Sequence, residues 1–470
     1  MIMGGIEIPD DPFERVIRAP LAVDYRWTGQ LRYSRRGRDL TGQGSFIVSE
    51  DEQRGTVEFD DLESITTRAA SGPVELSSEL PSNPGELVGE NRRGVAAAAD
   101  DSWTAFGCIS DGRTGFTDGE ETFHAAGVTV YGPSRGSAAM YYRSVYSNGR
   151  IAAAPDMAAW IAEDSLTLTR DRFNGSFQNR VTAFCNMREA QRHEADIVAV
   201  NYEGPGLDEL QSQALWMLAS FLSGRRVKQL YIESFDADGT MIERDYRHGG
   251  VGSTGSNEPF HQRFAPLQAD YLEVIGDGFV RALRGGFPIG VILHHLHSAN
   301  EGNPEADAQS LLLAIHTAFE AWNRRFGVRE LADTEIFRPL CCAMLALLEP
   351  LYATIGPEWA ETVRNKIRSS NNTSTNYRER DLFQTLSIVL DERDRSALAS
   401  RNQLLHNGYF LRRWHELSDA ERQERVDMPP RLRNLVHQVI LKLVGFRGTA
   451  IEATRYGSLQ IESSFCPRFG

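Results

Sequence analysis

The spacing of hydrophobic residues changes near residue 207, from a pattern typical of strands to one that is mainly typical of helices. Before it, apolar and polar residues alternate in short runs between glycine-rich and charged turns, a pattern that predicts β-strands. These runs are 22–27, 44–48, 55–59, 103–106, 127–131, 139–142 and 165–169. Residues 69–101 carry prolines, glycines and an alanine run, which predict a long loop or an insertion. We therefore expect residues 1–200 to form one mainly β domain, a sandwich or an irregular barrel.

After residue 207 apolar residues recur every three or four positions, as in amphipathic helices. The first such helix is expected to end at the cap signal Ser223-Gly224. A strand at 227–235 and a hairpin turn at Asp238-Gly239 follow. Glycine and serine then dominate a linker near 248–258. Residues 201–304 are thus expected to form a mixed α/β middle region.

Four apolar stripes with helical spacing predict a helical bundle over residues 305–470. The third is expected to lie in one helix from Asp381 to Gly408, and Pro350 is expected to kink or interrupt the second. The stripes are Leu311, Leu312, Ile315, Phe319 and Trp322; Phe337, Leu340, Met344, Leu347 and Leu348; Leu382, Phe383, Leu386, Val389 and Leu390; and Leu432, Leu435, Val436, Val439, Ile440, Leu443 and Val444. The expected fold class is α+β and multidomain, with a β-rich N-terminal region before an all-α bundle.

Composition and charge limit the class of protein, its expected location in the cell and its expected partners. Hydrophobic residues make up 41% of the chain and charged residues 24%, as in ordinary globular proteins, and no run approaches the roughly 18 apolar residues of a membrane span. The N-terminal residues lack the pattern of a signal peptide, so we expect a cytoplasmic protein without membrane partners. The net charge of −14 argues against a nucleic-acid partner, but residues 305–470 are close to neutral, with 22 Lys+Arg and 21 Asp+Glu. That region can still carry a basic groove.

Cysteines and histidines give little support for a metal or a cofactor. The five cysteines are scattered and show no zinc or disulfide spacing. His294, His295 and His297 are clustered, and the first and last of them would share a helix face. No carboxylate or cysteine stands at a recognised ligand spacing, which favours partly buried helix histidines over a zinc site. We expect no cofactor and no metal.

One short stretch, Arg401-Asn402-x-x-x-His406, suggests a definite chemistry. Arginine holds phosphoryl oxygens with paired hydrogen bonds, and histidine moves protons near neutral pH. Arg188 and His193 reproduce the same Arg-to-His spacing, but an asparagine directly after the arginine lowers the chance expectation to roughly one in twenty. These residues suit transfer of an RNA phosphodiester to its own 2′-hydroxyl, with no obligatory metal and no activity on DNA.

The spacing of the three residues suggests half of a site. Asn402 and His406 are four apart and share a helix face, whereas Arg401 and His406 diverge by roughly 140° around the axis. Two copies of the helix meeting across a two-fold axis would bring an arginine and a histidine together. In the alternative interpretation, Arg401 forms a surface ion pair with Asp391, Glu392 or Asp394, and His406 caps a helix.

Arg401-Asn402-x-x-x-His406, followed by Asn407-Gly408, resembles the signature of HEPN ribonucleases. The helical run that opens at Arg378-Glu379-Arg380-Asp381 is also similar, and a long β-rich region before such a domain resembles the ApeA-like anti-phage defence proteins. The resemblance implies a helical domain that dimerises, a composite metal-independent ribonuclease site with Arg401 and His406 in the catalytic positions and Asn402 in the polar one, and a role in bacterial abortive infection.

The sequence therefore predicts an endoribonuclease that acts as a homodimer on an RNA substrate, with N-terminal domains that sense a phage-derived trigger or restrain the nuclease. A second hypothesis is a non-catalytic subunit of a defence complex that uses a HEPN-like bundle for binding or assembly. A third is a β domain that binds carbohydrate or peptide, fused to a helical scaffold.

Overall fold

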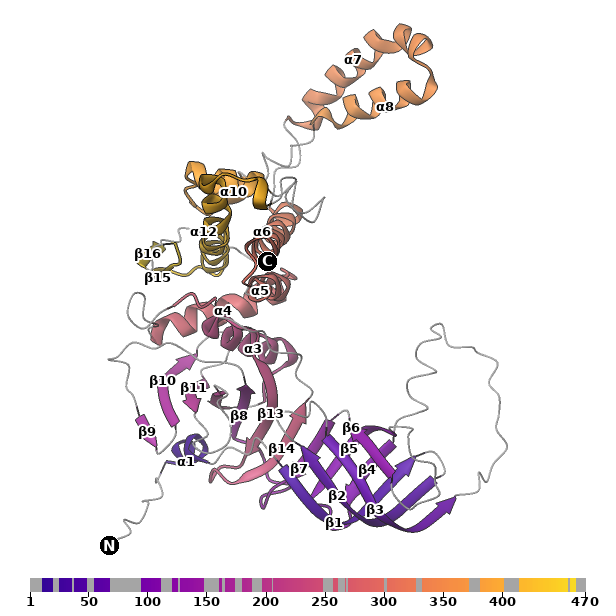
Figure 1. Ribbon diagram of the computed structural model, residues 1–470, viewed down its shortest axis with the longest axis vertical. Coiled ribbons are helices and arrows are strands. Elements are labelled where there is room, and N and C mark those ends of the chain that lie inside the picture. Colours follow the sequence, from indigo (N-terminus) through magenta and orange to yellow (C-terminus); the bar gives the residue numbers. More distant parts are fainter. Residues whose placement is uncertain are drawn as a thin grey trace. The chain divides into compact units, whose positions relative to one another are not determined.

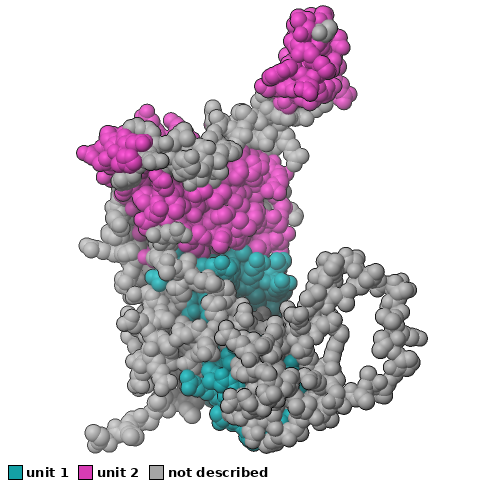
Figure 2. All heavy atoms as spheres, turned by 45° about the vertical axis from the view of Figure 1, so that its right-hand side comes forward, with its two compact units in different colours: residues 1–253, 268–273 teal, residues 254–267, 274–470 magenta. Residues whose placement is uncertain are grey.

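The computed structural model describes residues 11–19, 25–35, 38–48, 55–67, 94–110, 121–125, 127–147, 160–162, 165–173, 180–187, 197–204, 206–247, 257–260, 267, 269–299, 302–326, 332–371, 381–400, 414–454 and 457–461. The chain divides into two compact units, coloured separately in Figure 2. Unit 1 comprises Met1–Ser253 with Gln268–Glu273, and unit 2 comprises Thr254–Leu267 with Val274–Gly470. The division runs through helix α4 (Ala269–Arg284). The protein is thus of mixed α and β structure, as expected.

Unit 1 is built on a fourteen-stranded antiparallel sheet (Figure 1). The seven strand runs expected from the sequence all lie in or overlap its strands, because alternating apolar residues suit a sheet with one buried face. The alanine run that suggested a loop instead forms β4. The strands are β1 (Tyr25–Arg35), β2 (Arg38–Val48), β3 (Gly55–Thr67), β4 (Gly94–Ala98), β5 (Trp103–Ser110), β6 (Glu121–Ala125), β7 (Gly127–Tyr131), β8 (Tyr141–Ser147), β9 (Trp160–Ala162), β10 (Ser165–Phe173), β11 (Arg180–Met187), β12 (Ile197–Glu203), β13 (Lys228–Phe235) and β14 (Met241–Arg247).

The first six strands close on themselves. β4 pairs with β1 and also with β5, which completes the ring β4-β1-β2-β3-β6-β5. Trp103 fills this ring: it stacks on Phe46 with ring centroids 4.3 Å apart, and Trp27 meets its edge at 5.5 Å. Gly44 is required where β2 bulges against β3, because a Cβ there would overlap the carbonyl oxygen of Glu58. The N-terminal strands therefore form a small filled barrel.

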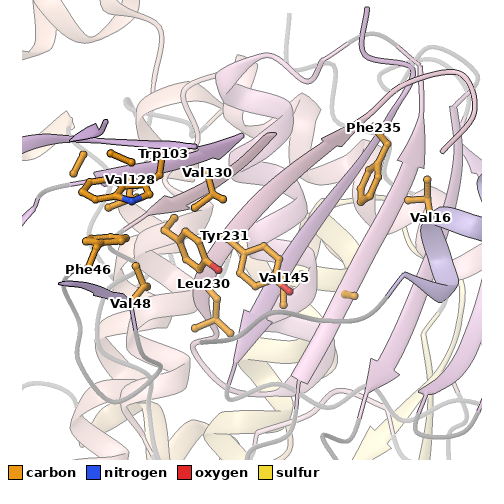
Figure 3. Close-up of a cluster of buried hydrophobic side chains, with 14 of the residues drawn as sticks. Val16, Phe46, Val48, Trp103, Val128, Val130, Val145, Leu230, Tyr231 and Phe235 are labelled. Atoms are coloured by element: carbon orange, nitrogen blue, oxygen red, sulfur yellow. The ribbon is translucent and has the colours of Figure 1, made fainter. Parts of the chain in front are cut away.

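The remaining strands extend the sheet from β7 in the order β14-β13-β8-β12-β11-β10-β9. β12 and β13 both pair with β8, and the chain crosses between them through helix α3 (Glu209–Ser223), which ends at Gly224 with φ 61°. Helix α1 (Pro12–Arg18) packs on β8, where Phe13 meets Tyr141 at 5.8 Å between ring centroids. A single hydrophobic core joins α1 and this part of the sheet to the barrel (Figure 3).

Unit 2 is mainly helical, and its centre is formed by three helices that pack on one another: α5 (Ile289–Ser298), α6 (Pro304–Arg325) and α12 (Asp419–Leu443). The apolar stripes predicted for 311–322 and 432–444 are buried in this contact, as expected. Helix α10 (Glu392–Ala399) packs against α12. A strand pair follows, β15 (Gly448–Glu452) with β16 (Gly457–Ile461). The helical C-terminal region predicted from the sequence is confirmed at this level.

Helices α7 (Thr334–Ile355) and α8 (Pro357–Arg368) run side by side as a hairpin (Figure 1). Its open end is closed by Asn371, whose side chain accepts from the backbone N–H of Ala332 and donates to its carbonyl, both at 2.9 Å. Two details of the helix bear on the prediction for the second stripe. α7 continues through Pro350, so this proline does not interrupt the helix, and three residues of the apolar stripe are exposed: Leu340, Met344 and Leu347.

The long helix expected from Asp381 to Gly408 is broken, which corrects another prediction. Residues 381–385 are helical, but Ser387 adopts φ 54°, and its N–H donates to the carbonyl of Gln384 while that of Ile388 donates to the carbonyl of Phe383. These two bonds form a Schellman motif that ends the helix. Leu382, Phe383 and Leu386 are buried as predicted, whereas Val389 lies past the break and is 90% exposed.

Candidate functional site

The candidate site is approached by α10, a short helix with a well-defined start. The side chain of Asp391 accepts from the backbone N–H of Asp394 at 2.7 Å, and the Asp394 side chain accepts from the backbone N–H of Asp391 at 3.1 Å. This reciprocal capping box satisfies two N–H groups that would otherwise lack partners. The hydrogen bond from the N–H of Asp394, and then the charge of Arg431, hold the pKa of Asp391 below its usual range.

α10 is tethered to α12 by polar contacts and by packing. Nη1 of Arg431 lies 3.0 Å from Oδ2 of Asp391 and 3.4 Å from Oδ1 of Asp394. Ser396 donates to Oε1 of Glu424 at 2.9 Å. Ala397 and Leu398 are buried. These contacts hold α10 against α12 as far as its last residue, Ala399.

The three predicted site residues, Arg401, Asn402 and His406, lie outside the described residues. The structure describes the chain up to Ser400 and again from Trp414, where a short 3₁₀ turn, η3 (Trp414–Glu416), precedes α12. What the structure adds to the predicted site is its frame, by which we mean the two helices that precede and follow the motif in the sequence, α10 and α12, with their charged side chains.

The frame bears on the alternative interpretation, in which Arg401 pairs with an acidic residue of α10. Two of the three acidic residues considered, Asp391 and Asp394, already contact Arg431. Arg431 was missed by the sequence analysis. The pattern Asp-x-x-Asp at 391–394 is a capping-box signal that could have located the start of α10, but no local signal connects it to an arginine 40 positions away.

α10 also presents two cations to solvent. Arg393 and Arg395 are exposed, and their side chains have no ion pair within the described part of the chain. By contrast, Arg425 of α12 is nearly buried and lies 2.8 Å from Oε1 of Glu305 at the start of α6. The helix that leads to the motif therefore carries guanidinium groups that can contact phosphate, next to arginines whose charge is compensated.

The three histidines of α5 face different surroundings. His294 is exposed and its ring centroid lies 5.5 Å from that of His295, whereas His297 is buried. Burial, and then the neighbouring His294, lower the pKa of His295. Within the described ranges, no three His, Cys, Asp or Glu residues gather as a possible metal site.

The most strongly perturbed groups lie away from α10 and hold the fold together. In unit 2, Nε2 of His437 donates to the carbonyl of Asn257 at 3.0 Å, and Asn257 donates to the carbonyls of Leu296 and Ala299. Burial, first, and the charge of Arg433 lower the pKa of His437 to about 3. This contact joins α12 to the end of α5, so we assign it a structural role.

In unit 1 a buried carboxylate connects two strands to a third. Glu233 of β13 accepts from Nε of Arg143 on β8 and from Nε of Arg244 on β14, both at 2.7 Å. Arg143 also donates to the carbonyl of Ala19 at 2.6 Å, just after α1. Burial raises the pKa of the neighbouring Tyr246 to about 12. The network binds β8, β13, β14 and the end of α1 together.

Comparisons with protein-family profiles, with curated proteins and with solved structures found no match to this chain. No helix within the described ranges is both long and apolar enough to cross a membrane. The chemistry proposed for the site therefore rests on the residues of this chain and on the frame around them.

Proposed function

We propose that the protein is a metal-independent endoribonuclease of the HEPN type. Arg401 stabilises the charge that develops on the phosphoryl oxygens, and His406 transfers protons. Asn402 orients His406 or the ribose. The 2′-hydroxyl of the substrate attacks the adjacent phosphorus, its proton is taken up, and the 5′-oxygen leaves with a proton. The products are a 2′,3′-cyclic phosphate end and a 5′-hydroxyl end, and no water or metal ion is needed for this step.

The observation that carries this proposal is that the Arg-Asn-x-x-x-His motif directly follows a helix whose two aspartates are both engaged by Arg431. Because Arg431 already engages Asp391 and Asp394, two of the three acidic residues considered as partners of Arg401 are occupied, which favours contact of Arg401 with phosphate over an internal ion pair. The exposed Arg393 and Arg395 add positive charge on the same helix, where RNA would approach.

The proposed assembly is a homodimer. Since one straight helix would turn Arg401 and His406 roughly 140° apart, we propose that two subunits together supply one composite site. We further propose that the protein acts in the cytoplasm in bacterial antiviral defence, as in abortive infection, and that unit 1 senses a phage-derived trigger.

The chemistry is tested with the purified full chain, a labelled RNA and the matching DNA, in buffer that contains EDTA. We expect cleavage of RNA alone, with 2′,3′-cyclic phosphate ends. Arg401→Ala and His406→Ala should each lower the rate about 100-fold or more, since each removes a group that acts on the transition state. His415→Ala, which removes an exposed histidine beyond the motif, is the control. RNA cleavage by His406→Ala at the wild-type rate would rule the proposal out.

A second candidate function is a non-catalytic binding or assembly subunit of a defence complex. The exposed apolar stripe of α7 favours it, because such a surface suits assembly. An absence of cleavage in the same assay, together with retained protection of bacteria against phage by the His406→Ala variant, would support this second candidate over the first.

A further inference from the structure

α7 carries apolar residues on two adjacent faces, and only one of them is covered within the described chain. Cys341 and Tyr352 are buried on the side of α8, where the guanidinium of Arg364 lies 4.3 Å from the ring centroid of Tyr352. The other face is exposed along the whole helix, with Leu347 at 77% and Ile336 at 72%. Six residues form it, and we call them the α7 row: Ile336, Leu340, Met344, Leu347, Leu351 and Ile355.

The spacing of the α7 row is symmetric. Its steps are 4, 4, 3, 4 and 4 residues, so the row is the same when it is followed from either end of the helix. The centre lies between Leu345 and Ala346. A two-fold axis through that point would place Met344 of one chain opposite Leu347 of another, and Leu340 opposite Leu351. In a two-fold contact residue i meets residue j and j meets i, and the symmetric spacing of the row lets every one of its apolar residues meet another apolar residue.

The chemistry and the exposed area of the α7 row also suit contact with a second copy of the chain. All six residues of the row are apolar, and the charged Arg338 and Glu349 lie on a different side of α7 by helical periodicity. The six residues of the row together expose roughly 700 Å², taking about 200 Å² for a fully exposed large side chain. Stable interfaces bury about 800 Å² on each partner, and monomers rarely expose apolar patches of this size.

We propose that the α7 row is the two-fold interface through which two copies of this chain associate, with the α7–α8 hairpins of both subunits forming a four-helix contact. The hairpin suits this role because Asn371 closes it onto Ala332, and Gly356 with φ 81° provides the tight turn between its helices. The inference goes beyond the ribonuclease proposal, which calls for a dimer and names no surface for it.

The first test measures the mass of the full chain in solution by sedimentation equilibrium at micromolar concentration. The wild type should be a dimer, and Leu347→Asp should halve the mass with an unchanged circular dichroism spectrum, since Leu347 is largely exposed within one chain. The matched control is Val389→Asp, an even more exposed apolar position off the hairpin, which should remain dimeric. A monomeric wild type, or a dimeric Leu347→Asp, overturns the proposal.

The second test asks whether the row pairs with itself. Leu340→Arg and Leu351→Glu should each be monomeric alone, because each places a charge opposite a leucine. Mixed together they should form a heterodimer, in which the arginine of one chain faces the glutamate of the other. A mixture that stays monomeric contradicts the two-fold pairing and points to another occupant. A failure of the ribonuclease proposal can be told apart from a failure of this one. If Leu347→Asp is monomeric and still cleaves RNA, the composite dimeric site is ruled out while the proposed interface is supported.

Discussion

Nη1 of Arg431 lies 3.0 Å from Oδ2 of Asp391, and this ion pair attaches the start of α10 to α12 across 40 positions of sequence. The same guanidinium nitrogen also reaches Asp394, the other half of the capping box. α10 ends two residues before Arg401. The pair therefore determines how the helix that leads to the motif is held.

Arg431→Ala should detach the start of α10 and reduce RNA cleavage while unit 2 stays folded. The cost in stability is expected to be about 1 kcal/mol, because the pair is partly exposed. Thermal unfolding and cleavage rate are measured together. Arg422→Ala is the control, since Arg422 pairs with the fully exposed Asp419 of its own helix. If Arg431→Ala cleaves RNA at the wild-type rate, α10 does not need this anchor for activity.

Ser387→Gly should stabilise the protein by about 0.5–1 kcal/mol. Ser387 has φ 54°, a left-handed conformation that glycine adopts without the steric cost of a Cβ. Its carbonyl accepts from Nζ of Lys442 at 2.9 Å, a bond that the substitution leaves in place. Urea unfolding measures the difference. Ser387→Ala, which keeps a Cβ, should bring no comparable gain, and equal gains for the two variants would show that backbone strain is not the cause.

His437 should make unit 2 less stable in mild acid. Its pKa in the folded state is lowered to about 3, against about 6.5 in the unfolded chain, so the unfolded state binds the extra proton throughout this window. The contribution of the neutral His437 to the free energy of unfolding is thus fully present above pH 6.5 and is lost as the pH falls toward 3. Between pH 7 and pH 5 the loss is about 2 kcal/mol.

His437→Gln tests this dependence, since glutamine can still donate to the carbonyl of Asn257 but does not take up a proton. Urea midpoints at pH 7 and pH 5 should differ less for this variant than for the wild type. His415→Gln, which removes a histidine from the surface, is the matched control. If the urea midpoints at pH 7 and pH 5 differ by the same amount for His437→Gln and for the wild type, His437 is not the source of the loss of stability in acid.

Glu233→Gln should destabilise unit 1 by about 3–5 kcal/mol, because it leaves the buried guanidinium of Arg143 without its counter-charge. The change preserves the shape of the side chain, so packing is not the cause. Glu243→Gln on the exposed side of β14 should change stability by less than about 0.5 kcal/mol. A loss below about 1 kcal/mol for Glu233→Gln would mean that water or rearrangement compensates the charge.

Elements with a regular apolar period could be predicted from the sequence. The strands between residues 25 and 147 and the helices α3, α6 and α12 bury residues that their periodicity selects, because burial of one face is what creates the period. Less regular features were not predictable. The end of the helix at Ser387 uses a left-handed residue other than glycine, for which the sequence has no strong signal.

The chemistry proposed for Arg401, Asn402 and His406 is determined by the sequence alone, since it depends on residue type and spacing within six positions. Only tertiary structure decided which arginine holds Asp391 and Asp394 of the preceding helix, and which apolar stripe of α7 is left uncovered within the described chain. The physical reason is that spacing along a helix shows which residues share a face. Whether that face is buried depends on distant segments, and in α7 the described chain provides a cover for one face and leaves the α7 row exposed.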